Sequence, residues 1–243
     1  MKKENVLFGI IGLLIGLVVG FTVTNSINRS SYSQMATPSS PSANVAAAQP
    51  QVSSQVVKDQ LQTGGAAMPQ IQQTLDRAKN NPTDFEAQIA AGDMYYRIQR
   101  FEEAAEFFEK AAQIKPGDYN TVVKAGNARF DAGAITMEQG GNGTENFIKA
   151  EKLYENALAK KPDDVNVRTD LGLTYFYRQP KDIERALKEF QTSLAANPNH
   201  EMTLQVTARA QTEKGDAAAV QETLSKLEKV NPNNPIIKQL RNQ

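Results

Sequence analysis

From residue 85 onward, hydrophobic positions recur with the spacing of amphipathic helices. Before Pro116, the residues Ala104, Phe108 and Ala111 stand four and three positions apart, which places them on one face of a helix. Three later stretches carry residues at the same spacing. They are Ala150, Tyr154 and Ala157, then Ala186, Phe190 and Ser193, then Val220, Leu224 and Leu227. The pattern predicts a succession of helices and an all-α fold.

Prolines divide this region at regular intervals. Pro82, Pro116, Pro162, Pro198 and Pro232 are separated by 34, 46, 36 and 34 residues. A unit of 34 residues with insertions of 12 and 2 residues accounts for all four intervals. A fixed period of this length is typical of stacked helical repeats. In each of the four units the closing proline follows the last residue of the three-residue set by five positions, where it ends that helix and forms the turn to the next pair.

A second helical pattern in each unit contains a small residue. Gly92, Gly126 and Gly172 occupy it in the first three units and Ala208 in the fourth. A glycine inside a helix costs about 1 kcal/mol relative to alanine, so its recurrence indicates that another helix crosses closely at this point. Tyrosines three positions later cover the crossing in units one and three, whereas Arg129 interrupts this feature in unit two.

The combination of Gly and an aromatic on the first helix with Ala, an aromatic, Ala and a closing Pro on the second resembles the tetratricopeptide repeat. The unit FEAQIAAGDMYYRIQRFEEAAEFFEKAAQIKPGD matches closely, although Phe85 and Gln88 replace the usual first-helix anchors. The resemblance covers residues 85–232 and implies a right-handed solenoid of antiparallel helix pairs. The stretch VNVRTDLGLTYFYR is also similar to bacterial envelope proteins of this superfamily, including periplasmic cytochrome c maturation factors.

These patterns predict a domain that occupies residues 69–243. We expect a first cap helix at 69–80 and a C-terminal cap at 233–243, because a solenoid needs covered ends. The four predicted repeats are 85–118, 119–164, 165–200 and 201–232. The Gly-rich stretch QGGNGTE at 139–145 lies in the 12-residue insertion of the second repeat, and we interpret it as a flexible turn.

Residues 1–24 predict a membrane anchor. Val6 to Thr24 is an uncharged run of 19 residues, which as a helix would extend roughly 28 Å, close to the thickness of the hydrocarbon core. Lys2 and Lys3 precede it, so we expect a single-pass protein of the inner membrane with a cytoplasmic N-terminus and an extracytoplasmic repeat domain. A cleaved signal peptide is the alternative, but no small-residue cleavage site follows promptly.

Two further features concern the N-terminal region. Gly12, Gly16 and Gly20 share one face of the predicted span and would permit a homodimer, unless they only reflect the abundance of glycine in membrane helices. Residues 25–68 are rich in Ser, Ala, Gln and Pro and predict a flexible, disordered linker, because they cannot bury enough apolar surface to offset the entropy of ordering.

Composition argues against most chemical functions. The 27 basic and 27 acidic residues balance, so no basic field exists for nucleic acid. With no Cys and with His200 as the single His, we expect no metal site, no cofactor and no catalytic residue, and therefore no enzyme. His200 is interpreted as a polar turn residue. Glu102 and Glu109 are interpreted as part of a solvated outer helix face.

The candidate partner-binding residues lie on the first helix of each unit, on the side away from the second helix. In the resembling family this side lines the concave groove. The candidates are Ile89, Asp93, Tyr96, Val123, Asn127, Phe130, Leu173, Phe176, Tyr177 and Arg209. Three aromatics, Tyr96, Phe130 and Phe176, recur four positions after the Gly and would form a stripe that anchors a peptide. The alternative is that they only pack between adjacent repeats.

We therefore expect a membrane-anchored scaffold or adaptor that binds a protein or peptide in the groove. The alternative is a periplasmic assembly factor that chaperones exported clients, as the likeness to cytochrome maturation factors implies. Part of the resembling family clamps a C-terminal carboxylate with Lys, Asn and Arg. The corresponding positions here, which include Ile89, Asp93 and Asp170, depart from that pattern, so we do not expect this ligand.

Overall fold

The computed structural model describes residues 67–241, and the secondary structure of this part is entirely helical. The helices follow one another with short turns and no strand intervenes in the described part. In chain order they are α3 (Ala67–Asn80), α4 (Phe85–Arg97), α5 (Phe101–Ile114), α6 (Tyr119–Glu138), α7 (Thr144–Lys160), α8 (Val165–Tyr177), α9 (Ile183–Ala196), α10 (Glu201–Lys214), α11 (Ala217–Val230) and α12 (Pro235–Arg241).

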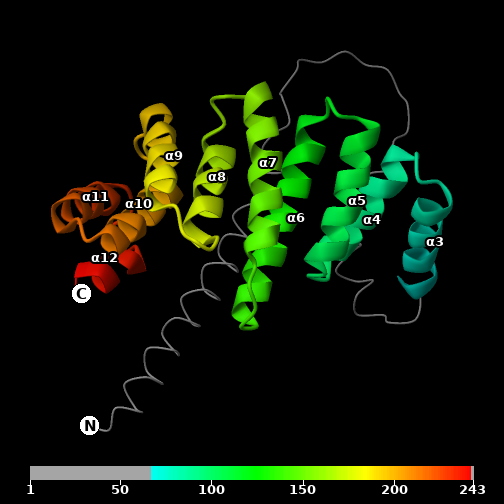
Figure 1. Cartoon of the computed structure of the whole chain (residues 1–243), viewed down its shortest axis with the longest axis horizontal. Coiled ribbons are helices and arrows are strands. Elements are labelled where there is room, and N and C mark those ends of the chain that lie inside the picture. Colours follow the sequence, from blue (N-terminus) through cyan, green and yellow to red (C-terminus); the bar gives the residue numbers. More distant parts are fainter. Residues whose placement is uncertain (1–66, 242–243) are drawn as a thin grey trace, which may run out of the picture. The chain divides into compact units, whose positions relative to one another are not determined.

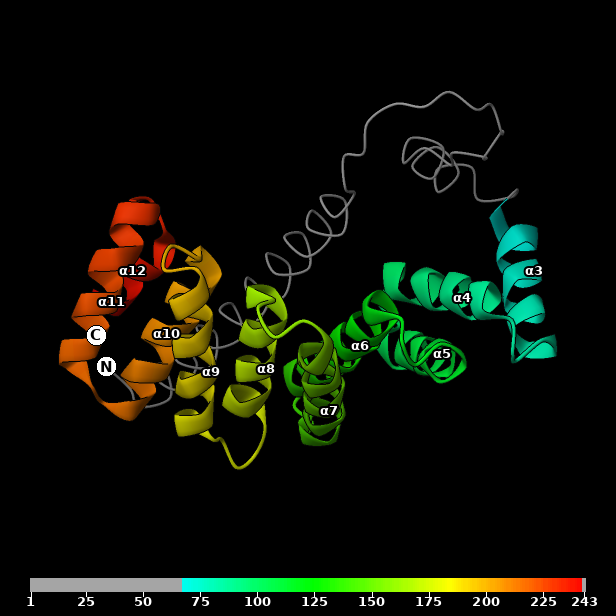
Figure 2. The same cartoon turned by 90° about the horizontal axis from the view of Figure 1, so that it is seen from above.

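The chain divides into two units, Met1–Asn80 and Asn81–Gln243. Helix α3 belongs to the first unit. The second unit contains four antiparallel helix pairs, α4/α5, α6/α7, α8/α9 and α10/α11, followed by α12. The second helix of each pair packs against the first helix of the next pair (Figures 1 and 2). Each predicted repeat therefore contains one such pair.

The first helix of each of the first three pairs begins after an aspartate. Asp84, Asp118 and Asp164 each accept a hydrogen bond from the backbone N–H three residues later, at 3.1, 2.8 and 3.0 Å. These bonds satisfy one of the N–H groups that a helix leaves without a partner in its first turn. Hydrogen bonding to Thr121 also holds the pKa of the Asp118 carboxyl below its usual value.

Within the first three pairs, the helices cross at the recurrent glycine. The ring of an aromatic residue on the second helix lies directly against the glycine Cα. A Cβ added at any of the three glycines would come closer than 3.0 Å to that ring. The contacts are Gly92 with Phe108, Gly126 with Tyr154, and Gly172 with Phe190. In the fourth pair Ala208 and Leu224 belong to one core cluster instead. Alanine thus stands in place of glycine where leucine stands in place of the aromatic residue.

The 12-residue insertion adds more residues to the two helices of the second pair than to the turn between them. Helices α6 and α7 have 20 and 17 residues, against 13 and 14 in α4 and α5. Only two of the added residues belong to the turn, which spans 139–143. The interpretation of 139–145 as one flexible turn is therefore wrong at its end, since Thr144 and Glu145 begin α7. Gly143 packs so closely against Gly133 that an added Cβ would overlap the Gly133 carbonyl.

The two-residue insertion of the third pair lies against this lengthened hairpin. It falls in the connection 178–182 between α8 and α9. The backbone N–H of Gln179 donates to the Thr144 hydroxyl at 2.9 Å, and Arg178 forms an ion pair with Glu151 at 3.2 Å. The insertion in the second repeat and the insertion in the third repeat are therefore in contact with each other.

Arg129 takes the place of the covering tyrosine in the second pair. Its guanidinium donates to both carboxylate oxygens of Glu109, at 2.6 and 2.7 Å, and also to Glu102. The arginine side chain is only 5% exposed. The interpretation of Glu102 and Glu109 as purely solvated is therefore wrong, because a cation from α6 binds both carboxylates of α5.

The C-terminal end of the second unit is covered by α12. Ile236, Ile237 and Leu240 are buried in one cluster with Leu224 and Leu227, which removes the apolar face of the last pair from water.

None of the helices in residues 67–241 is both long enough and apolar enough to cross a bilayer. The predicted span at 6–24, the glycines within it and the linker lie outside the described residues.

Replacement of Gly172 by Ala tests the helix crossing. We expect Gly172→Ala to lower the free energy of unfolding by about 1–3 kcal/mol, because the added methyl overlaps the Phe190 ring. The further change Phe190→Leu should recover part of the loss, since it reproduces the pairing of Ala208 with Leu224. Denaturant unfolding followed by circular dichroism measures both.

Gly117→Ala is the control, because no atom lies within 4 Å of the added methyl. Strictly additive effects of Gly172→Ala and Phe190→Leu would contradict the proposed fit between the two side chains.

Candidate partner-binding face

The predicted site residues all lie on α4, α6, α8 and α10, the first helices of the four pairs. We call the surface that these helices share the first-helix face. Their side chains contact one another across each boundary between repeats, so the face is continuous over the second unit.

At the boundary between α4 and α6, the contacts are polar. Lys124 Nζ lies 2.7 and 2.9 Å from the two carboxylate oxygens of Asp93, and the two side chains are 39% and 37% exposed. The Tyr96 hydroxyl donates to Asp131, a buried carboxylate. The charge of Lys124 is therefore balanced within the face itself.

At the boundary between α6 and α8, the contacts are aromatic. The ring centroid of Phe130 lies 5.3 Å from that of Phe147 and 6.0 Å from that of Tyr177. Phe147 and Tyr177 stack with centroids 6.1 Å apart. Phe130 is 1% exposed, so its ring joins the second repeat to the third.

At the boundary between α8 and α10, two cationic side chains contact the aromatic residues. The Arg209 guanidinium donates a hydrogen bond to the Tyr177 hydroxyl oxygen. The Lys181 ammonium lies 4.9 Å from the Phe176 ring centroid and 2.6 Å from Glu213. Burial raises the pKa of the Tyr177 hydroxyl, while the hydrogen bond that Arg209 donates to its oxygen acts in the opposite direction. Burial also lowers the pKa of Arg209.

The three boundaries share one register. The residue four positions after the small residue in one repeat meets the residue five positions after it in the next. The pairs are Tyr96 with Asp131, Phe130 with Tyr177, and Phe176 with Glu213 through Lys181. This recurrence ties successive repeats together. It favours the alternative in which the three aromatics pack between repeats.

The predicted residues therefore divide by exposure. Seven of them remain at least partly open to water, and we name them the half-exposed row: Ile89, Asp93, Tyr96, Val123, Asn127, Tyr177 and Arg209. Phe130, Leu173 and Phe176 are buried, with 1%, 1% and 6% exposure. The expected stripe of three exposed aromatics thus reduces to Tyr96, while binding by the half-exposed row stays a prediction.

Lys124 and Asp131 also belong to the first-helix face, although they are absent from the predicted set. Each provides the opposite half of a contact to a predicted residue, Asp93 and Tyr96 respectively. Both could have been selected from the sequence, because each is a charged residue on the predicted helix that also carries Val123 and Asn127.

The described part of the chain matches known helical-repeat proteins. Residues 65–119 match the model of a family described as tetratricopeptide repeat. Many solved structures are also similar. YrrB, described as a TPR protein with an unusual peptide-binding site, is 15% identical with a TM-score of 0.59, covering 76% of this chain and 88% of YrrB. The fold is that of the tetratricopeptide repeat.

Two other solved structures give the same result. MamA from Desulfovibrio magneticus RS-1, from position 41 to its end, is 15% identical with a TM-score of 0.58, covering 74% of this chain and 94% of MamA. TTC0263, a thermophilic TPR protein in Thermus thermophilus, is 15% identical with a TM-score of 0.53, covering 77% and 95%. No curated protein matches this chain. The family match and these structures support the TPR superfamily.

Replacement of Phe130 by Ala distinguishes an anchor for a partner from a contact between repeats. Because Phe130 is buried against two rings, we expect Phe130→Ala to lower the free energy of unfolding by about 3–5 kcal/mol. Thermal melting followed by circular dichroism measures the change. Val123→Ala is the control, since Val123 is half-exposed on the same helix and should cost much less. An unchanged melting temperature for Phe130→Ala would show that the ring does not join the repeats.

Proposed function

We propose that this chain is a membrane-tethered scaffold or adaptor that binds a segment of a partner protein on the first-helix face. The observation that carries the proposal is the half-exposed row, which runs over α4, α6, α8 and α10 of a TPR fold. The similar protein YrrB is described as a TPR protein with an unusual peptide-binding site, which supports a peptide segment as the class of ligand.

The chemistry of the row indicates how a segment would be held. Ile89 and Val123 provide apolar contacts at equivalent positions of successive repeats. Asn127 lies one turn after Val123 on α6, and its Oδ1 accepts from the Tyr154 hydroxyl of α7 at 2.9 Å. Such a mixture of apolar contacts and fixed polar groups suits an extended or helical segment whose side chains alternate in character.

The tether is the second part of the proposal. It is supported by the uncharged run from Val6 to Thr24 and by Lys2 and Lys3 before it. We propose that the N-terminus lies in the cytoplasm, that residues 6–24 cross the inner membrane, and that the repeats are on the extracytoplasmic side. The Gly12, Gly16 and Gly20 stripe would allow two anchors to associate.

An assembly factor for exported clients is the second candidate. It is favoured by the likeness of the third repeat to cytochrome c maturation proteins. The two functions differ in the ligand: an adaptor binds a folded complex stably, whereas an assembly factor binds short apolar peptides weakly and releases them.

A pair of matched variants tests the binding face. A photoreactive residue at Ile89 should capture a partner in cells, and the added change Val123→Arg should abolish the capture because it places a bulky charge on the face. Ile148→Arg is the control, because Ile148 is 39% exposed on α7, the second helix of the same pair. Mass spectrometry identifies the captured protein. Equal capture with Val123→Arg and Ile148→Arg would contradict binding on the first-helix face.

Membrane fractionation tests the tether separately. We expect the full chain to stay with membranes after alkaline extraction and a chain that begins at residue 25 to be released. A phosphatase fused after Gln243 should be active only if the repeats are extracytoplasmic. Release of the full chain would contradict the anchor without affecting the evidence for the binding face.

A further inference from the structure

The turn between α6 and α7 contains an asparagine that is followed directly by a glycine, Asn142 and Gly143. In such a pair the main-chain nitrogen of the glycine can attack the side-chain amide of the asparagine, because glycine has no side chain to shield that nitrogen. Asn142 is exposed, so water can accept the proton and the ammonia that the reaction releases. It is the single asparagine of the chain that precedes a glycine.

The surroundings of Asn142 favour this attack. The Thr144 N–H donates to Asn142 Oδ1 at 3.0 Å. This bond withdraws electrons from the amide carbon and stabilises the negative charge that develops on the oxygen during attack. It lies at the first turn of α7, where N–H groups without helical partners favour negative charge. In the described part of the chain the Gly143 N–H forms no hydrogen bond, so no other contact holds the attacking nitrogen.

Three other turns provide an internal comparison. Asn197, Asn231 and Asn234 each accept a bond from the N–H two residues later, at 3.2, 3.2 and 3.0 Å. Each of them is followed by a proline, whose nitrogen carries no hydrogen and cannot act as the nucleophile. Of these four turns, only the one before α7 joins the hydrogen bond to a reactive neighbour.

We propose that Asn142 is a self-modifying site, which cyclises with Gly143 and is converted to aspartate and isoaspartate. The Gly143 nitrogen gives its proton to a solvent base and forms a bond to Asn142 Cγ. The bond from Cγ to the amide nitrogen breaks, and that nitrogen takes up a proton and leaves as ammonia. Water then opens the succinimide ring. Opening at Cγ gives aspartate, whereas opening at the main-chain carbonyl gives isoaspartate, in which the main chain runs through Cβ and Cγ.

The two products have different effects on the structure. Aspartate keeps the main chain and adds a negative charge beside the first turn of α7, where the helix dipole favours it. Isoaspartate lengthens the main chain by one carbon directly before Gly143. That glycine is packed so closely that an added Cβ would overlap the Gly133 carbonyl oxygen, so the longer chain displaces it. The bond from the Gln179 N–H to the adjacent Thr144 hydroxyl is then lost.

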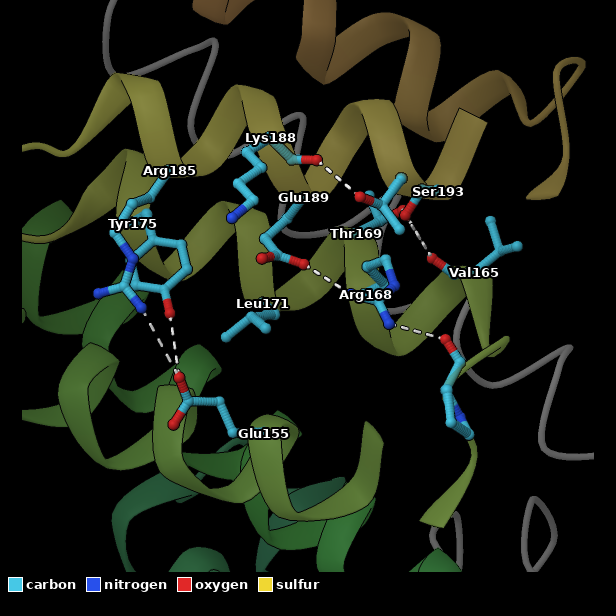
Figure 3. A network of polar contacts seen from close by, with 12 residues as sticks. Glu155, Val165, Arg168, Thr169, Leu171, Tyr175, Arg185, Lys188, Glu189 and Ser193 are labelled. Carbon is cyan, nitrogen blue, oxygen red and sulfur yellow. Dashed lines mark hydrogen bonds and ion pairs between the residues drawn. The ribbon is translucent and has the colours of Figure 1, made fainter. Parts of the chain in front are cut away.

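The rest of the boundary between the second and third repeats is held at a distance from this turn. The Tyr175 hydroxyl donates to Glu155 at 3.3 Å, and Arg185 forms an ion pair with the same carboxylate at 3.8 Å (Figure 3). Glu155 lies about three helical turns after Thr144 on α7. Isoaspartate therefore loosens the end of the hairpin and the connection 178–182, while the repeats stay together.

Prolonged incubation of the full chain in mildly alkaline buffer tests the proposal. We expect mass spectrometry of a digest to show conversion of amide to acid in the peptide that contains Asn142. Peptides that contain Asn197, Asn231 or Asn234 should stay unchanged. A protease that cleaves before aspartate but not before isoaspartate separates the two products. Hydrogen exchange of the isoaspartate form should show less protection at 144–148 and 178–182 than the fresh chain, with α9 unchanged.

Two variants serve as controls. Asn142→Gln keeps an amide but would have to form a larger ring, so it should not be modified. Asn142→Asp reproduces one product and should keep the protection at 178–182. A loss of protection in Asn142→Asp equal to that of the isoaspartate form would overturn the proposed effect of the longer main chain, as would full protection in the isoaspartate form.

The free peptide GGNGTEN measures what the fold contributes. We expect Asn142 in the folded chain to be converted at least as fast as the asparagine of the peptide, because the Thr144 N–H and the start of α7 stabilise the developing charge. Slower conversion in the folded chain would show that the fold protects Asn142 and would overturn the proposal. Neither result depends on whether a partner binds the first-helix face.

Discussion

The fold depends on the close approach of two helices at one small residue in each pair. In the first three pairs an aromatic ring lies directly on Gly92, Gly126 or Gly172, at a distance that no side chain on that residue would permit. Burial of the ring stabilises the crossing and offsets the cost of about 1 kcal/mol that glycine imposes on its helix. Because the crossing sets how each pair is oriented, it also sets which side of the first helix faces outward.

The insertions show how this constraint is kept while the repeat length changes. The second pair has longer helices, yet Gly126 and Tyr154 still meet as their counterparts do. The extra turns extend beyond the crossing and close on a second contact between Gly133 and Gly143. The third pair then lengthens its own connection, where Gln179 bonds to Thr144. Changes in length are thus confined to the end of the hairpins away from the capping aspartates.

The helix pairs could be predicted because their constraint is local and is repeated in the sequence. Gly, the aromatic and the Pro recur at fixed offsets, so each repeat supports the interpretation of the others. The burial of Phe130 and Phe176 could not be predicted in the same way. Helical periodicity predicts that they lie on the side away from the second helix. In the structure Phe130 packs against Phe147 of α7, the second helix of its own pair, and against Tyr177 of the next repeat. Whether Phe130 is buried thus depends on residues such as Tyr177, which is 47 positions away.

The ion pairs of Arg129 could not be predicted from the sequence either. As one charged residue among many, it carries no sign of the two glutamates that bind it, since Glu102 and Glu109 have the spacing of any solvated helix face. Only the packing of α6 against α5 brings the three together. Charges on helices are interpreted reliably from sequence when their partner is one turn away, and poorly when the partner belongs to another helix.

The division of the first-helix face into buried and half-exposed residues bears on the proposed binding of a partner. The buried aromatics and the Asp93–Lys124 pair already have partners within the array. A ligand that relied on the charge of Lys124 would have to displace Asp93, and the gain from an exposed ion pair is only about 0–1 kcal/mol. In the proposed complex, affinity would therefore come from the apolar surface of Ile89 and Val123 and from the polar atoms beside them. The face should discriminate by shape and hydrogen bonding more than by net charge.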